Sequence, residues 1–174
     1  MKVEVFKLWG SIPESIMKVL VEATESVPEE VFFERDGRVR KDEIKEIDGK
    51  IKNFLEKKWK LEKVVVPDTR FDFDLAFPKE KILIHIEKGK LARLELDILK
   101  ALSLCHRQHE WKYCVMIVPS NIELTLAPHY SPCEYLKHLI KLAEPLLEKS
   151  GLEGFYAICY EDPRIPSTSG RAPT

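Results

Sequence analysis

Residues 70–87 read RFDFDLAFPKEKILIHIE, and this is the most informative stretch of the sequence. Residues 70–77 alternate polar and apolar side chains, as a half-buried β-strand does. The Pro-Lys-Glu-Lys segment at residues 78–81 is typical of a hairpin turn. Residues 82–87 carry isoleucine at every second position, which predicts a second strand with one face toward the core. The stretch therefore predicts a β-hairpin.

Both strands of this hairpin carry acidic side chains. Asp72 and Asp74 share one face of the first strand, and His85 and Glu87 share the face of the second strand that the isoleucines leave free. Carboxylates on two adjacent strands can converge on a hard cation such as Mg²⁺, which polarises a phosphate and activates a bound water. Such a set is typical of a metal-dependent phosphodiesterase. The alternative is a polar hairpin face that only meets water.

Elements of both types surround the hairpin. Apolar residues at helical spacing predict helices over residues 42–58, 91–105 and 132–148, and a further helix that follows residue 11. Continuous apolar runs predict buried strands at residues 113–118 and 155–160. This order predicts an α/β class, with a mixed sheet that has helices on both faces.

Length and composition favour one domain. With 174 residues, 44% of them hydrophobic, the chain is expected to form a single domain over residues 1–162. A helical part at residues 1–60 precedes the core at 64–162, and the Pro- and Ser-rich residues 163–174 are expected to form a flexible tail. No apolar run is long enough for a membrane span, so a cytoplasmic protein with no membrane partner is expected.

Net charge limits the kinds of partner to expect, and cysteine content indicates the redox environment of the protein. The 28 basic and 29 acidic residues give a net charge of −1, so a site for a polyanion must be a local basic patch. One candidate patch is the lysine group that precedes the hairpin, at positions 57, 58, 60 and 63. The four cysteines stand far apart, which favours reduced thiols in an intracellular protein. The Cys and His residues at 105–114 match no common zinc-finger spacing, so the two thiols are expected in the core.

A family resemblance adds to this reading. The Arg-Phe-Asp-Phe segment at 70–73, the strand at 82–87, the Gly-Lys pair at 89–90 and the amphipathic helix after it resemble the PD-(D/E)xK nuclease superfamily. Within it, the chain is most similar to type II restriction endonucleases of the BglII and BamHI kind, over residues 57–162. The resemblance implies a restriction-endonuclease-like central mixed β-sheet flanked by helices on both faces. It also implies a homodimer, Mg²⁺ and double-stranded DNA as substrate.

The active-site motif departs from the family pattern, and two registers stay open. In the most direct register His85 occupies the position of the metal-binding acid, Glu87 the last position and Ala76 that of the first Asp. Asp74 takes the place of that first acid if the hairpin is two residues longer. In the other register Glu87 is the metal-binding acid, and a lysine supplies the positive charge after a bulge near Gly89.

The resemblance and the residues together predict a metal-dependent endodeoxyribonuclease, a hydrolase of phosphodiester bonds. The predicted ligands of Mg²⁺ are Asp74, Glu87 and His85, and the imidazole would make Mn²⁺ a further candidate. Asp72 is accessory. The positive charges that stabilise the transition state or contact DNA phosphates are Lys88, Lys90 and Arg93. The alternative function is a catalytically inactive DNA-binding or partner-binding module that retains the nuclease fold.

Overall fold

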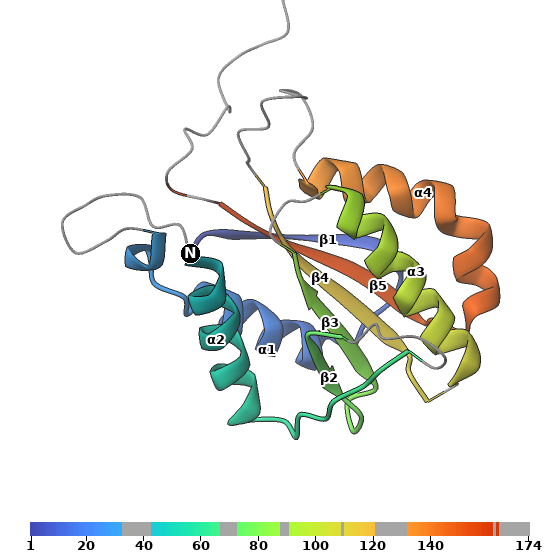
Figure 1. The fold of residues 1–174 in the computed structure, drawn as a ribbon, viewed down its shortest axis with the longest axis horizontal. Coiled ribbons are helices and arrows are strands. Elements are labelled where there is room, and N and C mark those ends of the chain that lie inside the picture. Colours follow the sequence, from blue (N-terminus) through green and yellow to red (C-terminus); the bar gives the residue numbers. More distant parts are fainter. Residues whose placement is uncertain are drawn as a thin grey trace, which may run out of the picture.

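The computed structural model describes residues 1–32, 43–66, 73–87, 91–108, 110–120, 132–161 and 163. At its centre lies a mixed sheet of five strands in the order β1-β5-β4-β3-β2 (Figure 1). β3, β4 and β5 are parallel to one another, and the two edge strands β1 and β2 are antiparallel to their neighbours. The strands span Val3–Gly10 (β1), Leu75–Phe77 (β2), Ile82–Ile86 (β3), Tyr113–Pro119 (β4) and Gly154–Tyr160 (β5).

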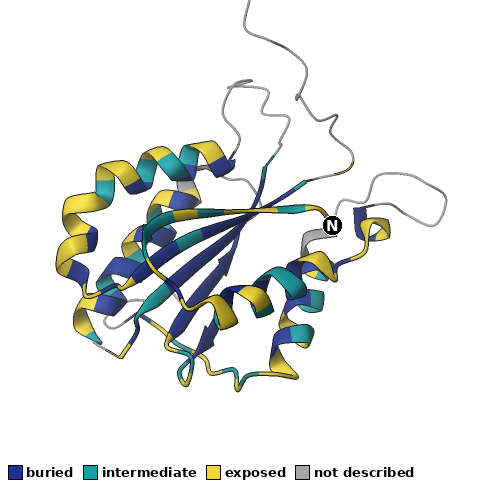
Figure 2. Ribbon diagram, turned by 180° about the vertical axis from the view of Figure 1, so that it is seen from behind, coloured by how far each residue is buried: buried dark blue, intermediate teal, exposed yellow. Residues whose placement is uncertain are grey.

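Helices cover both faces of this sheet. α1 (Glu14–Glu25) and α2 (Glu43–Glu56) lie on one face, and α3 (Leu91–Arg107) and α4 (Pro132–Ser150) lie on the other. A short 3₁₀ helix, Glu29–Phe32, follows α1. Figure 2 shows that the strands are mostly buried, whereas each helix turns one buried stripe inward and its exposed residues outward. This arrangement confirms the predicted α/β class with a mixed sheet.

Alternate residues of β3 enter two separate cores. Ile82, Ile84 and Ile86 belong to the core under α1 and α2. Leu83 belongs to the core under α3 and α4. The predicted separation of faces is therefore confirmed. Because α3 covers the second face, however, His85 and Glu87 are buried rather than turned toward water.

The four predicted helices and the strands predicted at residues 82–87, 113–118 and 155–160 are confirmed, and where both ends of an element were predicted they differ by up to two residues. Two expectations about strands were wrong. No strand was predicted at the N-terminus, but β1 pairs with β5 there, at the far end of the sequence. The strand predicted over 70–77 is a strand only at residues 75–77, and residues 70–72 lie outside the described residues. Phe73 instead bonds through its backbone N–H to the carbonyl of Val64.

The expectation of four reduced cysteines was also wrong. Cys133, in the first turn of α4, forms a disulfide with Cys159 near the end of β5, with the two Cα atoms 6.0 Å apart. Cys105 and Cys114 are free and buried, as expected for core thiols. Sequence spacing could not show the bond, because its geometry arises only when α4 packs on β5.

Removal of this disulfide is expected to lower the free energy of unfolding by about 3.5 kcal/mol in the chain-entropy model of loop closure. The loop that it closes has a sequence separation of 26 residues. Guanidinium unfolding of the Cys133→Ala/Cys159→Ala variant, compared with the oxidised wild type, measures the difference. Equal stability of the two proteins, or reaction of all four thiols with iodoacetamide in unfolded protein that was never reduced, would contradict the expectation.

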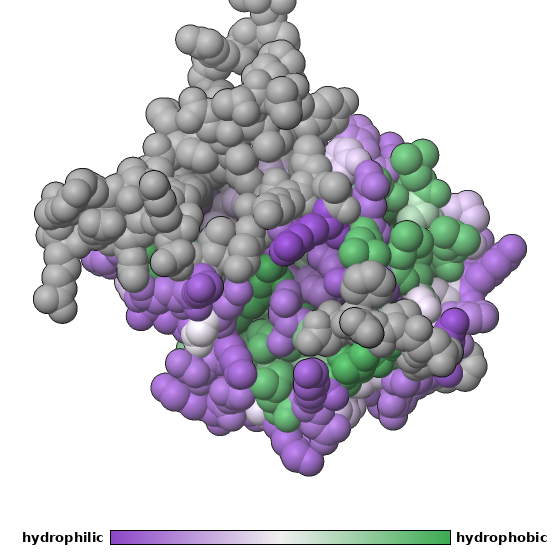
Figure 3. All heavy atoms as spheres, in the orientation of Figure 1, coloured by the Kyte–Doolittle hydropathy of each residue, from purple (hydrophilic) through white to green (hydrophobic). Residues whose placement is uncertain are grey.

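The outer surface gives two further facts. Within the described ranges, every helix is too short or too polar to cross a bilayer. Figure 3 shows apolar side chains gathered over α3 and α4, where Leu99, Leu142 and Leu146 are exposed. Of the predicted tail, only Pro163 lies inside the described residues.

Candidate active site

The hairpin places Asp74 and His85 opposite each other. Leu75, the first residue of β2, pairs with Ile84, so Asp74 and His85 are the next residues along the two chains toward the carboxyl end of β3. Nδ1 of His85 lies 2.9 Å from Oδ2 of Asp74, and the same oxygen accepts a 2.9 Å hydrogen bond from the backbone N–H of Ile86. Oδ2 of Asp74 therefore takes part in two hydrogen bonds. The Asp74 side chain is still 49% exposed, so it also borders solvent.

α3 extends this contact with two more charged side chains. Nε2 of His85 lies 3.7 Å from Oδ1 of Asp97, and Nζ of Lys100 lies 2.6 Å from the same oxygen. The exposed fractions of these side chains are 4% for His85, 7% for Asp97 and 13% for Lys100. The ring of Phe73 packs on the imidazole, with centroids 4.6 Å apart. We call Asp74, His85, Asp97 and Lys100 the polar chain.

The positions of the protons in the polar chain follow from the chemistry of its four side chains. Burial raises the pKa of Asp74, but the hydrogen bond and charge of His85, the N–H of Ile86 and the charge of Lys100 together hold that pKa below its usual 3.8. The carboxylate is therefore ionised at neutral pH and can only accept, so Nδ1 of His85 donates the hydrogen bond. Nε2 has no hydrogen-bond partner among the described residues, because 3.7 Å to Asp97 exceeds hydrogen-bond length.

The lowered pKa of Asp74 predicts the direction in which the free energy of unfolding changes with pH. Between the native and the unfolded pKa the unfolded chain binds more protons, so the contribution of Asp74 is present above about pH 4 and is lost as the pH falls through the native pKa. The difference in unfolding free energy between the wild type and Asp74→Asn should therefore shrink under acid. Urea unfolding from about pH 6 down to about pH 2.5 measures it. A difference that stays constant over this range would contradict the lowered pKa.

Glu87 lies just beyond the carboxyl end of β3. Its backbone N–H bonds to the carbonyl of Ile117 at 3.0 Å, which continues the pairing of β3 with β4. The residue is 5% exposed. Asp74, His85 and Glu87 thus all lie at or next to the carboxyl end of β3. In open sheets with parallel strands, ligands bind at this end of the strands.

The remaining predicted site residues are Arg93, Asp72, Lys88 and Lys90. Arg93 is exposed in the first turns of α3. Asp72, Lys88 and Lys90 lie outside the described residues.

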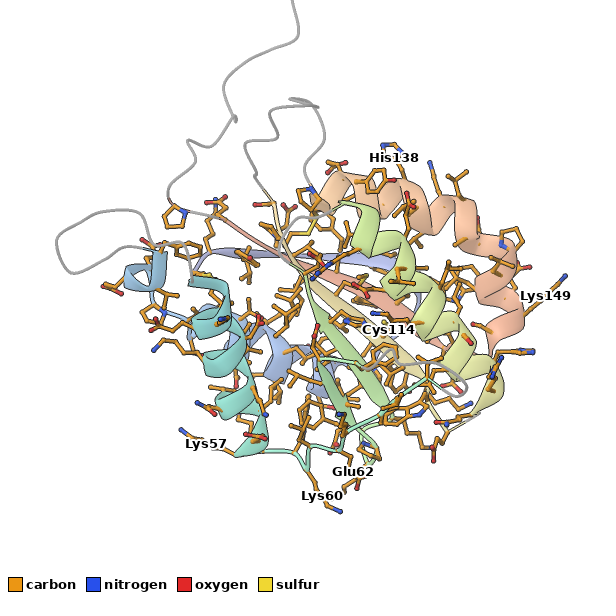
Figure 4. All side chains as sticks on the ribbon, viewed as in Figure 1. Lys57, Lys60, Glu62, Cys114, His138 and Lys149 are labelled. Atoms are coloured by element: carbon orange, nitrogen blue, oxygen red, sulfur yellow. A yellow bond between two sulfur atoms is a disulfide. The ribbon has the colours of Figure 1, made fainter. Side chains whose placement is uncertain are left out.

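The lysine group that precedes the hairpin follows the end of α2. Figure 4 shows Lys57 and Lys60 at the lower end of the molecule, where the turn between β2 and β3 also lies. Lys58 pairs with Glu22 of α1 at 3.0 Å, and Lys60 pairs with Glu62 at 3.0 Å. The group therefore neighbours the closed end of the hairpin, whereas the acids lie at the opposite end of β3.

The buried thiols do not supply a nucleophile. Burial raises the pKa of Cys105 to about 12. Burial, together with the charges of Cys105 and Asp97, also raises the pKa of Cys114 well above that of an ordinary thiol. A thiol needs a lowered pKa to react at neutral pH. In Figure 4, Cys114 lies inside the sheet layer beneath α3.

The arrangement of possible metal ligands can be stated for the described part of the chain. There, no group of three or more His, Cys, Asp or Glu side chains is arranged to hold an ion. Mg²⁺ is nevertheless commonly bound by one or two carboxylates, with water and substrate phosphate in its other positions. Asp74 and Glu87 are donors of this hard type, and they fit Mg²⁺ better than a closed zinc site. The ligand roles of Asp74, Glu87 and His85 remain predictions.

Asp97 and Lys100 were not predicted as site residues. The signal in the sequence was an acid, Asp97, at helical spacing from buried Leu94 and Ala101, where an apolar residue is expected. An acid at such a position needs a buried partner. Only the packing of α3 on β3 shows that the nearby groups are Lys100 and His85.

No family model, curated protein or solved structure matches the chain. The likeness to the PD-(D/E)xK superfamily therefore stays a prediction, and a function must be inferred from the site itself.

Proposed function

We propose that this protein is a metal-dependent endodeoxyribonuclease with a restriction-endonuclease-like fold. The observation that carries the proposal is the pair of carboxylates at the carboxyl end of β3. Asp74 has one oxygen fixed by His85 and Ile86 and a side chain that is half exposed. Glu87 lies two residues beyond His85 in the sequence and is buried. Asp74 directly precedes β2 and Glu87 directly follows β3, and these two strands are neighbours in the sheet.

The donor set favours Mg²⁺, with Mn²⁺ as a substitute. Asp74 and Glu87 would hold the ion, and the ion would polarise the phosphate and lower the pKa of a bound water. Nδ1 of His85 contacts Asp74, and Nε2 faces Asp97. In this proposal the imidazole orients the Asp74 carboxylate.

The reaction that this site would catalyse is hydrolysis of a phosphodiester. The oxygen of water forms a bond to phosphorus, and the bond from phosphorus to one sugar oxygen breaks with its electron pair. The water loses a proton, and the departing sugar oxygen gains one. Positive side chains near the site stabilise the charge on the phosphate, and the candidates in this chain are Lys88, Lys90 and Arg93.

The proposal includes double-stranded DNA as substrate and a homodimer as the active form. Each copy offers one such carboxylate pair, so two copies would cut the two strands of a duplex. The proposed location is the cytoplasm. A disulfide such as Cys133–Cys159 is unusual there outside hyperthermophiles.

A second candidate function is a DNA-binding or partner-binding module without catalysis. The specific observation in its favour is that the described residues hold no three-ligand group, while His85 stands where the resemblance expects a metal-binding acid. Such a module would bind duplex DNA without cutting it.

One experiment separates the two candidates. Supercoiled plasmid is incubated with the full chain and Mg²⁺, then with Mn²⁺, and in each case against a control with EDTA. Metal-dependent conversion to nicked, linear or fragmented DNA supports the nuclease. Retarded migration of intact plasmid, without any cleavage in either metal, overturns the nuclease and supports the module.

A further inference from the structure

The two outer edges of the sheet differ. Beside β2, the N–H of Glu62 bonds to the carbonyl of Ala76, and the N–H of Phe73 bonds to the carbonyl of Val64. The segment that contains Glu62 and Val64 therefore lies along that edge. Among the described residues β1 pairs only with β5, and it forms the opposite edge of the sheet (Figure 1). An uncovered edge strand offers its outward N–H and C=O groups to a further strand.

The hydrogen bonds of β1 fix which of its backbone groups point outward. The N–H of Glu161 donates to the carbonyl of Lys2, just before the first pair of the β1–β5 register. In an antiparallel ladder every second residue turns its backbone groups toward the neighbouring strand. The groups that point away from β5 therefore belong to Val3, Val5 and Lys7. A register shift that follows Lys7 ends this outward run.

This outward run is suited to a second copy of the same strand. About a two-fold axis at Val5, Val5 of the two copies would face each other, and Val3 of each copy would face Lys7 of the other. Each of these pairs exchanges both of its N–H···O=C bonds, because all three residues point their backbone groups outward. The Val5 side chain is 40% exposed, so the second copy would also cover apolar surface.

Charges beside β1 are complementary in the same arrangement. Nζ of Lys137, on α4, lies 3.4 Å from the centroid of the Phe6 ring. Phe6 would face the exposed Glu4 of the second copy, on the side of the sheet that α4 covers. The ammonium of Lys137, which already contacts Glu134 at 2.6 Å, would therefore stand close to a carboxylate of the other copy. The two-fold axis repeats this contact.

We propose that two copies of the chain associate through the outer edges of their β1 strands, antiparallel and about a two-fold axis at Val5, so that the two sheets form one continuous sheet. The inference rests on the proposed function in one respect, because it assigns an interface to the homodimer named there. A second copy fits better than an open-ended array, since the pairing uses the β1 edge of both copies and the segment beside β2 lies along the other edge.

The first test is Val5→Pro, with association of the full chain measured by sedimentation equilibrium. Proline removes an N–H that points away from β5, so the bonds within one copy are retained. The dissociation constant of the dimer is expected to rise by about 100-fold, because the axis counts the lost bond twice and one bond is worth up to about tenfold. Val5→Thr keeps the N–H and the branched side chain, and it should dimerise like the wild type.

The second test uses cysteine substitutions to check the register. Val5→Cys would place two thiols across the axis with Cα atoms about 5.5 Å apart, within the range of a disulfide. Val3→Cys is the matched control, since its two thiols would stand more than about 13 Å apart along the strands. After oxidation with diamide, Val5→Cys should form a covalent dimer and Val3→Cys should not. A mixture of Val3→Cys with Lys7→Cys should cross-link, although neither variant does so alone. The free thiols Cys105 and Cys114 are buried and should not contribute.

The outcomes separate this interface from the proposed function. If the wild type is a dimer but folded Val5→Pro dimerises as tightly, or Val5→Cys forms no covalent dimer, the interface is wrong and the homodimer stands. A wild type that is monomeric with and without duplex DNA overturns both, and leaves the β1 edge to a strand of another protein. A dimer with the expected cross-links but no metal-dependent cleavage contradicts the nuclease alone. Should Val5→Pro fail to fold, the cross-link of Val5→Cys decides.

Discussion

Glu87→Gln is expected to lower the rate of metal-dependent DNA cleavage by about 10³-fold. The substitution keeps the size of the side chain and removes the negative charge that would hold the cation. A bound metal ion contributes several kcal/mol of charge stabilisation in the transition state, and about 4 kcal/mol corresponds to about 10³-fold in rate. The isosteric amide is preferred to alanine because Glu87 is 5% exposed and a smaller residue would leave a cavity. Plasmid cleavage under single-turnover conditions measures the loss.

A second glutamate serves as the control for this substitution. Glu62 carries the same charge on the surface, paired with Lys60 at 3.0 Å, and Glu62→Gln should cleave at the wild-type rate. If Glu87→Gln also cleaves at that rate while the wild type depends on a metal ion, Glu87 does not hold the ion. Asp74→Asn then becomes the decisive variant, since it removes the other carboxylate of the pair.

Gly10→Ala is expected to lower the free energy of unfolding by about 3–5 kcal/mol, through backbone strain and a direct clash. Gly10 ends β1 with φ at +51°, a region that residues with a Cβ avoid. A Cβ there would lie 1.9 Å from the carbonyl oxygen of Glu153. That oxygen accepts a 2.8 Å bond from the N–H of Ser11, so its displacement also breaks the corner that leads into α1. Urea unfolding measures the loss.

At another glycine, substitution by alanine is expected to stabilise the protein. Gly49 lies inside α2, and a Cβ there would meet no atom within 4 Å. Gly49→Ala should therefore stabilise the protein by about 1 kcal/mol, because alanine loses less backbone entropy in a helix. Equal effects of the two substitutions would show that the turn at Gly10 does not have the described conformation.

The candidate site was predictable in part. The alternation of residues 82–87 was enough to separate the isoleucines from His85 and Glu87, since side chains of a strand point to opposite faces in turn. The partner of His85 was not predictable. Asp72 and Asp74 share a strand face, and only the pairing of Leu75 with Ile84 decides that Asp74 is the one opposite the imidazole.

Contacts between segments that are distant in the sequence cannot be predicted from local residue patterns. None of the eight residues of β1 is buried, and β1 forms a strand because β5 offers it a hydrogen-bonding edge. The Cys133–Cys159 disulfide likewise depends on how α4 meets β5. Propensity and periodicity describe neighbours in sequence, whereas these features join elements that meet only after the sheet has formed.

By itself the sequence determined the helix periods, the hairpin, the buried strands and the face of β3 that carries the polar groups, because each of these depends on residues a few positions apart. Tertiary structure alone decided the order of the strands, the cover that α3 places over that polar face, and the polar chain from Asp74 to Lys100. The physical reason is that a buried charge takes its character from groups packed around it in space, and those groups come from different elements.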